Sequence, residues 1–425
     1  MINKICVVGL GYIGLPTAVM FANHGKVVHG VDINEEIVNK INRKQLHIEE
    51  KGLKEKLIEA IDQKHLTVST KPEEADVFII AVPSPIKHDK TANLSYVEKA
   101  TEAIVPYLQQ GNLVILESTV PPLTVEKVML PVLEKTNLEI GRELFVAHSP
   151  ERVIPGKVFE ELINNDRIIG GINEKSSEIA VELYRTFVVG NIHITDAKTA
   201  ELVKVIENTY RDVNIAFANE LARICDNLNI NVWEAIKLAN YHPRVNIHSP
   251  GPGVGGHCIA VDPWFLVELQ PETAKLIGLA RNINDSMPHY TTNKVISIIK
   301  KQSIHHGKVA VLGLSYKADI DDTRESPSLD VIRALEEQKM EYSVFDPHIK
   351  EQIFMKQTKT IEEAVEHADL ILIMTNHQEF KRLNPESLKD KMRTKIIYDT
   401  KKCIDEDKWK QAGFEVYVLG DSSSN

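Results

Sequence analysis

The sequence predicts an α/β protein with two Rossmann-like, doubly wound parallel-sheet domains, joined by a central helical domain that contains one long helix. Three observations lead to this prediction. Short β-branched runs alternate with helix-like segments in the first 195 residues, the alternation stops after residue 195, and it returns near residue 303. Strands that alternate with helices form parallel sheets with helices on both faces. We therefore expect domains at residues 1–195, 196–302 and 303–425.

The apolar runs give the expected strands of each sheet. In the first domain they are Lys4–Gly9, Val27–Asp32, Leu66–Ser69, Asp76–Val82, Leu113–Glu117, Leu144–His148 and Ile168–Gly171. In the last domain they are Lys308–Gly313, Tyr342–Asp346, Asp369–Thr375, Lys395–Asp399 and Phe414–Leu419. Between them, apolar residues recur at helical spacing without Gly or Pro from about Asp196 to Asn229, which predicts a helix of about 30 residues. Helical character continues, after a Gly/Pro-rich loop, through Asn282–Lys301.

Charge and cysteine content exclude several classes of function. The chain of 425 residues has 50 Lys and Arg against 60 Asp and Glu, a net charge of −10, so no basic field favours nucleic acid or an anionic membrane. No apolar run approaches the roughly 20 residues of a membrane helix, and Met1–Val8 lacks a secretory pattern. Four separated cysteines without a CxxC pair indicate neither a disulfide framework nor a zinc cluster. We expect a cytoplasmic protein that needs no metal.

A dinucleotide fingerprint lies between the first two expected strands. Gly9-Leu-Gly11-Tyr-Ile-Gly14 follows a strand and opens a helix, and Asp32 ends the next strand. Gly9 permits the tight turn, Gly11 allows backbone N–H groups to approach a pyrophosphate, and Gly14 allows close packing of helix and sheet. An acid at Asp32 binds a ribose diol and repels a 2′-phosphate, which favours NAD over NADP.

A second group of residues surrounds one cysteine. The segment Gly251-Pro-Gly-Val-Gly-Gly-His-Cys258 is followed by Asp262, and its glycines free the backbone to wrap around a ligand. Cys258 is therefore the cysteine presented for chemistry, although a buried, inert thiol is an equally good interpretation of the local sequence. Lys204, Asn208 and Asp212 share one face of the long helix, and the alternative there is a solvated polar stripe.

The last domain begins like the first one. The run from Lys4 to Gly14 aligns with the run from Lys308 to Ala318, and only the first glycine is retained, which suggests the same fold with a different ligand. The loop that follows contains Lys317, Asp322, Arg324 and Ser326. Loops at the carboxyl ends of such strands bind ligands, and Lys with Arg suits phosphate, but alone this is ordinary loop chemistry.

Several separated motifs in one order give a family resemblance over nearly the whole chain. They are the fingerprint with Asp32, Val82-Pro-Ser-Pro85, Glu117-Ser-Thr-Val-Pro121, Ser149-Pro-Glu-Arg152, the helix with Lys204 and Asn208, the loop from Gly251 to Cys258 with Asp262, and Lys317 with Asp322-Thr-Arg-Glu-Ser-Pro327. Together they resemble the UDP-glucose/GDP-mannose dehydrogenase family.

The resemblance implies a two-NAD, four-electron oxidation of a sugar C6 alcohol to a carboxylate through a Cys258 thioester. It implies catalytic roles for Cys258, Lys204, Asp262, Asn208, Glu151 and Thr119. It implies cofactor contacts at Gly9, Gly11, Tyr12, Ile13, Gly14, Asp32, Pro83, Ser84, Thr119 and Arg324. It implies substrate contacts at Glu151, Arg152, Lys204, Asn208, Arg244, Gly253, Gly255 and Lys317. Which of Lys204, Asp262 and Glu151 is the base in the first oxidation stays open.

Substrate and assembly also follow only from the resemblance. The segments Ser149–Gly156, His242–Arg244 and Gly255–Phe265 are most similar to family members that oxidise UDP-N-acetyl-D-mannosamine. UDP-N-acetylglucosamine and UDP-glucose are the alternative substrates, and a two-electron 3-hydroxyacid dehydrogenase or a non-catalytic nucleotide-binding protein are the alternative functions. The resemblance further implies a homodimer or higher homo-oligomer, with Arg244 reaching a neighbouring subunit's site, and a role in capsule polysaccharide synthesis.

Overall fold

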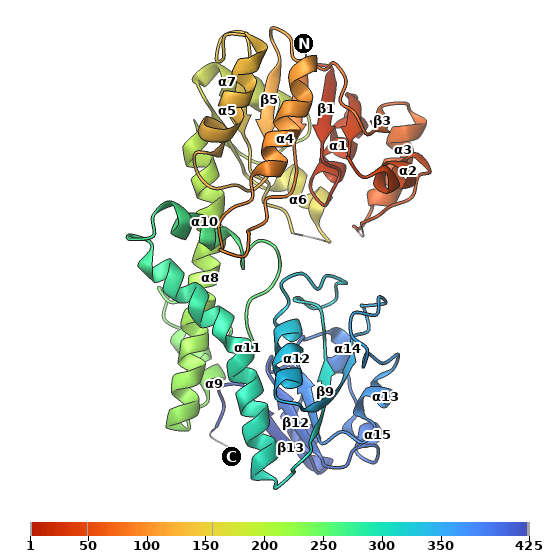
Figure 1. Cartoon of the computed structure of the whole chain (residues 1–425), viewed down its shortest axis with the longest axis vertical. Coiled ribbons are helices and arrows are strands. Elements are labelled where there is room, and N and C mark those ends of the chain that lie inside the picture. The colour runs from red at the N-terminus through yellow and green to blue at the C-terminus, as the bar shows by residue number, and fades with distance from the viewer. Residues whose placement is uncertain (1, 49, 155, 423–425) are drawn as a thin grey trace. The chain divides into compact units, whose positions relative to one another are not determined.

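The computed structural model describes residues 2–48, 50–154 and 156–422. The chain divides into two compact units, which we call unit 1 (Met1–Glu207 with Trp264–Leu269) and unit 2 (Asn208–Pro263 with Gln270–Asn425). Each unit contains a sheet dominated by parallel pairings, and long helices lie between the two sheets in the sequence (Figure 1). The predicted fold class is confirmed.

Unit 1 contains a sheet with the strand order β3-β2-β1-β4-β5-β6-β7-β8. Its strands are β1 (Lys4–Val8), β2 (Val27–Val31), β3 (Leu66–Ser69), β4 (Val77–Ile80), β5 (Leu113–Leu116), β6 (Phe145–His148), β7 (Arg167–Gly171) and β8 (Ile192–Asp196). Two features differ from the prediction. The pair β6–β7 is antiparallel, and β8 was not among the expected strands. β8 is an edge strand that is half-buried or exposed throughout, so it lacks the continuous apolar run of a buried parallel strand.

Alternating residues of β1 enter two different cores. Ile5 and Val7 pack in one core, whereas Cys6 and Val8 pack in the other, as expected for a strand whose successive side chains point to opposite faces. The first core is covered by α1 (Gly14–Asn23), α2 (Glu35–Asn42), α3 (Leu53–Asp62), α6 (Val158–Asn164) and α7 (Glu174–Tyr184). The second is covered by α4 (Ser95–Ile104), the π-helix η2 (Val125–Met129) and α5 (Leu130–Leu133). Unit 1 is thus a sheet between two helical layers.

The long helix forms as the periodicity predicts. α8 runs over 32 residues, Ala197–Leu228, which corresponds to about 48 Å at 1.5 Å per residue. It ends at Asn229, whose φ of 55° lies in the left-handed region, and the N–H of Ile230 closes the end by donating to the carbonyl of Cys225 (3.0 Å). The division between the units falls within this helix.

Unit 2 contains a parallel sheet with the order β10-β9-β11-β12-β13. Its strands match the predicted runs: β9 (Lys308–Leu312), β10 (Glu341–Phe345), β11 (Leu370–Ile373), β12 (Ile396–Asp399) and β13 (Glu415–Val418). Val309 and Val311 pack with α11 (Lys275–Lys301) and α12 (Pro327–Glu337). Ala310 and Leu312 face the core of α13 (Ile361–Val365), α14 (Gln378–Lys381), α15 (Pro385–Leu388) and α16 (Glu406–Gln411).

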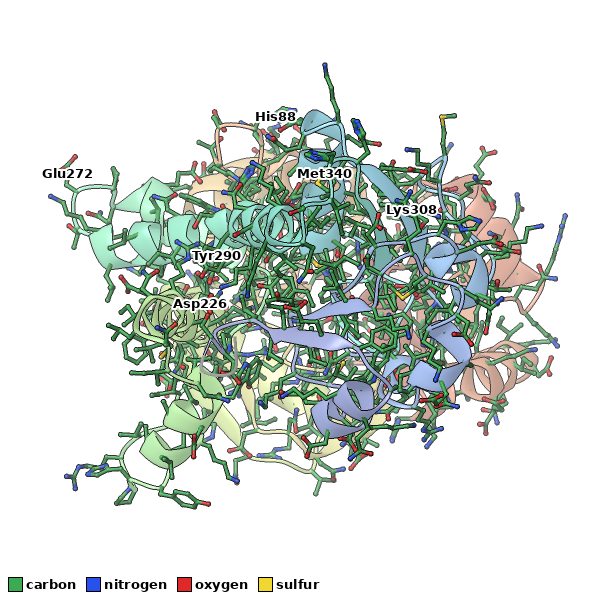
Figure 2. The ribbon with its side chains drawn as sticks, turned by 90° about the horizontal axis from the view of Figure 1, so that it is seen from below. His88, Asp226, Glu272, Tyr290, Lys308 and Met340 are labelled. Carbon is green, nitrogen blue, oxygen red and sulfur yellow. The ribbon has the colours of Figure 1, made fainter. Side chains whose placement is uncertain are left out.

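Polar contacts attach α8 to the rest of unit 2. The hydroxyl of Tyr290 on α11 donates a hydrogen bond to Asp226 on α8, and these two residues lie near each other in Figure 2. Lys294, one turn further along α11, forms an ion pair with the same carboxylate (3.4 Å). Searched over the residues that the structure describes, the helices include none with both the length and the apolar character to cross a membrane.

Candidate active site

The glycine turn of unit 1 has the geometry that the fingerprint predicts. Gly9 has a φ of 94°, and a Cβ at Gly9 would lie 2.5 Å from the carbonyl oxygen of Ala81. A Cβ at Gly14 would lie 1.8 Å from the carbonyl oxygen of Gly9. Gly11 is different, because a Cβ there would meet nothing within 4 Å. Gly9 and Gly14 therefore make the turn possible, while Gly11 leaves the backbone open at the start of α1, where a pyrophosphate fits.

Asp32 lies at the end of β2 and is oriented by the backbone. Its Oδ2 accepts a hydrogen bond from the N–H of Leu10 (3.0 Å), and its Oδ1 accepts one from the N–H of Asn34 (2.9 Å). Tyr12 and Ile13, between the glycines, are both half-buried, and Ile13 directly precedes α1. The carboxylate is half-buried at the rim of the glycine turn. This donor set fits NAD, whose ribose diol an acid at this position accepts.

The two Pro-containing segments that follow β4 and β5 are tied together. Ser118 donates to the carbonyl oxygen of Val82 (2.7 Å) and accepts from the N–H of Val82 (2.9 Å). Ser84 donates to the carbonyl oxygen of Thr119. Pro83 is exposed, and Thr119 is half-buried. The predicted cofactor residues Pro83, Ser84 and Thr119 therefore come together at the carboxyl ends of neighbouring strands.

Glu151 belongs to a buried network of charges. Its Oε2 lies 2.5 Å from Nη2 of Arg167, and its Oε1 accepts the N–H of Arg152 (2.7 Å). Nη1 of Arg167 is 3.7 Å from Oε1 of Glu117. Burial raises the pKa of Glu117 to about 7, against the opposing charge of Arg167. Burial by itself would lower the pKa of Arg167, but Glu151, Tyr184 and Glu117 together outweigh it and the pKa is raised.

Two predicted substrate residues lie near this network or on the long helix. The side chain of Arg152 forms an ion pair with Glu207 (2.6 Å) and donates to the carbonyl oxygen of Asp166 (3.0 Å). Lys204 lies on α8 and is half-buried, and among the described residues it has no ion-pair partner. Lys204 thus keeps a cationic head that is available to an oxyanion.

In unit 2 the glycine loop packs against the chain itself. A Cβ at Gly255 would lie 2.5 Å from the carbonyl oxygen of Glu325, and one at Gly253 would lie 3.0 Å from Pro327. Gly256 donates its N–H to the carbonyl oxygen of Arg324 (3.0 Å), and its φ is 83°. The glycines at these positions therefore allow close contact with the Tyr316–Pro327 segment. This contact brings Gly253 and Gly255 next to the predicted phosphate loop. That Gly253 and Gly255 also contact the substrate stays a prediction.

Cys258 begins the turn that leads into α10 (Asp262–Leu269). Its carbonyl oxygen accepts the N–H groups of Val261 (3.0 Å) and Asp262 (2.8 Å), and the residue is partly exposed. Asp262 is 2% exposed, and its Oδ2 accepts a hydrogen bond from the amide of Asn208 (2.6 Å). The predicted residues Cys258, Asp262 and Asn208 are therefore brought together, with Asn208 held against Asp262.

The other cysteines are less suited to chemistry: Cys6 and Cys225 are buried, and burial raises the pKa of the partly exposed Cys403.

The remaining predicted residues of unit 2 are on the surface. Lys317 and Arg324 are exposed, and the guanidinium of Arg324 binds both carboxylate oxygens of Asp322 (2.9 and 2.6 Å). Arg244 is exposed in the turn after α9 (Val232–Ala239). Arg324 belongs to unit 2, and its role as a cofactor residue stays a prediction.

One cluster of side chains in unit 2 has the composition of a metal site, although the spacing of its residues in the sequence gave no sign of it. Asp319, His348, His377 and Glu379 offer donor atoms within 4.8 Å of one another. Nδ1 of His377 accepts the N–H of Asp319 (2.9 Å), and its Nε2 lies 3.2 Å from Asp346. His377 is therefore already used by protein groups, and Asp319 and Glu379 are exposed. That no metal is needed stays a prediction.

The turn at Gly9, the open backbone at Gly11 and the acid at Asp32 define a dinucleotide-binding protein, and Cys258 with Asp262 adds a group suited to covalent chemistry. The class is that of a dinucleotide-dependent oxidoreductase.

Comparisons with known proteins extend this class to a family. The chain matches the NAD binding domain of the UDP-glucose/GDP-mannose dehydrogenase family at residues 3–188, its central domain at 198–286 and its UDP binding domain at 310–406. The chain belongs to this family. It is an NAD-dependent sugar-nucleotide dehydrogenase, and its cofactor is NAD.

Individual relatives are similar over their whole length. UDP-N-acetyl-D-mannosamine dehydrogenase of Methanococcus vannielii is 50% identical over 429 residues, which cover 99% of this chain and 98% of the relative. The solved structure of UDP-D-ManNAc dehydrogenase from Pyrococcus horikoshii has a TM-score of 0.94 at 43% identity and covers 99% of this chain and 100% of that one. The UDP-N-acetyl-mannosamine dehydrogenase Cap5O of Staphylococcus aureus has a TM-score of 0.91 at 48% identity, with 99% and 100% coverage.

The sequence motifs do not include Arg167, which contacts Glu151 and Glu117, or Tyr184, which contacts Glu117. A signal was present for Glu117, because it is an acid that directly follows an apolar strand in a recognised motif. No comparable signal marks Arg167, which precedes an apolar run as many surface residues do.

Proposed function

We propose that this protein oxidises the C6 alcohol of UDP-N-acetyl-D-mannosamine to the carboxylate of UDP-N-acetyl-D-mannosaminuronate with two NAD. The observation that carries the proposal is the partly exposed Cys258 directly before the buried pair Asp262–Asn208. A partly exposed thiol four residues before a fixed carboxylate suits covalent capture of an aldehyde and later hydrolysis. The similarity to UDP-N-acetyl-D-mannosamine dehydrogenases over 99% of the chain supports this substrate.

The proposal assigns the cofactor to unit 1. Gly9, Gly11 and Gly14 hold the pyrophosphate at the start of α1, Asp32 accepts the ribose diol, and Ser84 and Thr119 border the nicotinamide. NAD, when bound, accepts a hydride from C6 in each of the two oxidations. In the first one a base of this chain removes the hydroxyl proton, and Lys204, Asp262 and Glu151 are the candidates.

The second half of the proposed reaction uses Cys258. Its thiolate adds to the aldehyde carbon and forms a C–S bond, and the carbonyl oxygen takes up a proton to give a thiohemiacetal. Loss of that proton and of the second hydride leaves a thioester. Lys204 and Asn208 stabilise the oxyanions that form at C6 in these steps.

Hydrolysis completes the proposed reaction. Asp262, with Glu151 and Thr119 placing the water, accepts a proton as the water attacks the thioester carbon. The C–S bond breaks, the thiolate of Cys258 leaves, and the carboxylate forms. Each sugar nucleotide thus consumes two NAD and one water.

Binding of the sugar nucleotide follows the same division into domains. We assign cofactor binding to residues 1–195, the cysteine loop and dimer contacts to 196–302, and UDP binding to 303–425. The proposed contacts to the substrate or to phosphate are Glu151, Arg152, Gly253, Gly255, Lys317 and Arg324.

The proposal also includes a second subunit. Arg244, exposed in its turn, is proposed to reach the site of that subunit, and exposed apolar residues of α8 such as Ile206, Tyr210 and Phe217 would be the dimer contact.

The experiment that tests the proposal counts NADH. Limiting UDP-N-acetyl-D-mannosamine is consumed with excess NAD, in parallel with UDP-N-acetylglucosamine and UDP-glucose, for the wild type and for Cys258→Ala. We expect two NADH per UDP-N-acetyl-D-mannosamine for the wild type and little turnover of the other sugars. Cys258→Ala should not complete the four-electron oxidation.

Each other result points to a specific alternative. Two NADH from another UDP-sugar only would change the substrate and keep the mechanism. One NADH with release of the aldehyde, or full activity of Cys258→Ala, would contradict the thioester and favour a two-electron dehydrogenase. Saturable nucleotide binding without NADH from any sugar would favour the non-catalytic protein.

A further inference from the structure

Arg167, the first residue of β7, is enclosed by groups of unit 1 that it contacts directly. It is 4% exposed, and its Nη2 lies 2.5 Å from Oε2 of Glu151. Nη1 donates to the hydroxyl of Ser149 (3.0 Å). The guanidinium carbon is 4.2 Å from the ring centroid of Tyr184. The head of Arg167 is thus fixed on one face by a ring and at its edges by two polar groups.

A second carboxylate, that of Glu117, lies 3.7 Å from Nη1 of the same guanidinium. Glu117 is 2% exposed, accepts the hydroxyl of Tyr184 at Oε1 (2.6 Å) and accepts the hydroxyl of Thr17 at Oε2 (3.2 Å). Because burial raises the pKa of Glu117 to about 7, this group is largely protonated in mildly acidic solution. Of the two carboxylates, Glu151 is the closer to the guanidinium, at 2.5 Å against 3.7 Å for Glu117.

The carboxylate of Glu151 is consequently held at both oxygens. Oε2 contacts Arg167, and Oε1 accepts the backbone N–H of Arg152. Glu151 and Arg167 line a hollow in unit 1 together with Arg152 and Asp166. A carboxylate held at both oxygens and facing a hollow is preorganised to orient a small polar molecule there.

We propose that Arg167 is the positioning residue for Glu151: it keeps the carboxylate in one orientation, with Glu117 and Tyr184 as its support. The inference rests on the proposed function, because it takes Glu151 to act in the reaction. A purely structural role is the alternative, but a buried ion pair adds little stability over an apolar replacement, so stability alone does not explain the arrangement.

A double-mutant cycle tests the proposal on the full-length protein. Glu151→Gln, Arg167→Met and the double variant are compared with the wild type for kcat and for KM of NAD with UDP-N-acetyl-D-mannosamine. If Arg167 acts through Glu151, each single change lowers kcat by about 100-fold, and the second change adds less than about 3-fold to the first. KM for NAD should stay within about 2-fold, because the glycine turn is untouched.

Two further variants separate positioning from support of the fold. Arg167→Lys keeps a cation and should recover at least about 10-fold of the kcat lost in Arg167→Met. Arg185→Met is the matched control, because Arg185 belongs to the same unit and its side chain, among the described residues, donates only to the carbonyl oxygens of Val188 and Gly190. It should lower the melting temperature without changing kcat. Where Arg167→Met does not fold, Arg167→Lys takes its place in the cycle.

The outcomes distinguish this inference from the proposed function. A wild type that oxidises no UDP-sugar contradicts the proposed function before the cycle is measured. An active wild type with an impaired Glu151→Gln and additive losses, near 10,000-fold in the double variant, overturns the role of Arg167 only. A folded Arg167→Met with wild-type kcat also overturns it. Full activity of Glu151→Gln removes both the role of Glu151 and that of its positioning residue.

Discussion

The two sheets begin with the same strand and turn but use the acid after their second strand differently. In unit 1, Gly9 donates to the carbonyl oxygen of Val31, and Asp32 accepts the N–H of Leu10. In unit 2, Gly313 donates to the carbonyl oxygen of Phe345, and Asp346 accepts the N–H of Leu314 (2.6 Å). The φ values of the two glycines are 94° and 101°. The backbone of the first strand, turn and second strand is therefore repeated.

The difference is in what surrounds the acid. Asp346 is 5% exposed and also accepts the N–H groups of Ser315 (3.0 Å) and His348 (2.8 Å). Although burial opposes it, hydrogen bonding to His377 lowers the pKa of Asp346 to about 2. Asp32 is half-buried and stays at the surface of the turn. The shared backbone thus does not decide the ligand: an acid with all its hydrogen bonds inside the protein supports the fold, and an accessible acid is free to accept a ribose.

The largest expected effect comes from filling the turn in unit 1. Gly14→Ala should weaken NADH binding by more than about 100-fold, because its Cβ would lie 1.8 Å from the carbonyl oxygen of Gly9 and the turn must move. The titration of intrinsic fluorescence with NADH measures this. Gly11→Ala should weaken NADH binding without lowering the melting temperature, since its Cβ meets no protein atom within 4 Å. In unit 2, Ala318→Gly should change neither the NADH affinity nor the melting temperature. Normal NADH binding by Gly14→Ala would contradict the role of the glycine turn in unit 1.

A smaller effect should distinguish the two acids. Asp346→Asn should destabilise unit 2 by about 2 kcal/mol, because buried N–H groups and His377 lose a charged acceptor. Asp32→Asn should cost less than about 1 kcal/mol of stability but lower NADH affinity by about 10-fold. Urea unfolding and NADH titration of both variants give the result. Equal losses of NADH affinity in the two variants would show that Asp346 is not confined to supporting the fold.

The smallest effect concerns acid stability. His148 of unit 1 is fully buried, and a hydrogen bond with the backbone of Leu116 offsets little of the effect of that burial. Burial lowers its pKa to about 3. Between about pH 6.5 and 3, His148 is therefore protonated in the unfolded chain and neutral in the folded one. His148 lowers the free energy of unfolding as the pH falls through this range.

The variant His148→Leu isolates this contribution. Its free energy of unfolding relative to the wild type should rise by about 1.4 kcal/mol for each pH unit below about 6.5. Urea unfolding at pH 7, 6 and 5 measures the difference. The comparison with the wild type is needed because two other groups have the opposite pH dependence. Burial raises the pKa values of Glu117 and Glu201 to about 7, so these groups increase the free energy of unfolding as the pH falls from about 7 to 4.5. A constant difference between the two proteins would rule out a neutral, buried His148.

The sequence was sufficient where one local pattern determines the outcome. Apolar runs located the strands of unit 2 within one or two residues, and helical periodicity located α8. The glycine turn followed from three spacings. β8 was missed because its half-exposed residues do not form an apolar run, and the antiparallel β7 was missed because strand direction depends on the whole sheet.

The parts of the site that the sequence did not predict depend on tertiary contacts. Glu117, Glu151 and Arg167 follow or begin three different strands, so no spacing brings them together. The glycines of the cysteine loop were recognised, but their close neighbours, Tyr316 and Pro327, are about 60 to 75 positions away in the chain. The local sequence indicates what chemistry a residue type can perform, but it does not indicate which residues will surround it in the folded protein.

The end of the second sheet has a consequence for the order of folding during synthesis. After β13, the carbonyl oxygen of Leu419 accepts the indole N–H of Trp233 (2.8 Å), and Gly420 accepts the N–H of Val232 (2.9 Å). A ribosome releases Val232 and Trp233 almost 190 residues before these partners. The start of α9 must therefore wait for nearly half of the chain to be translated, whereas the strands of the first sheet are complete at Asp196. A nascent chain paused in β12 would present a finished first sheet and an unsatisfied α9 to chaperones.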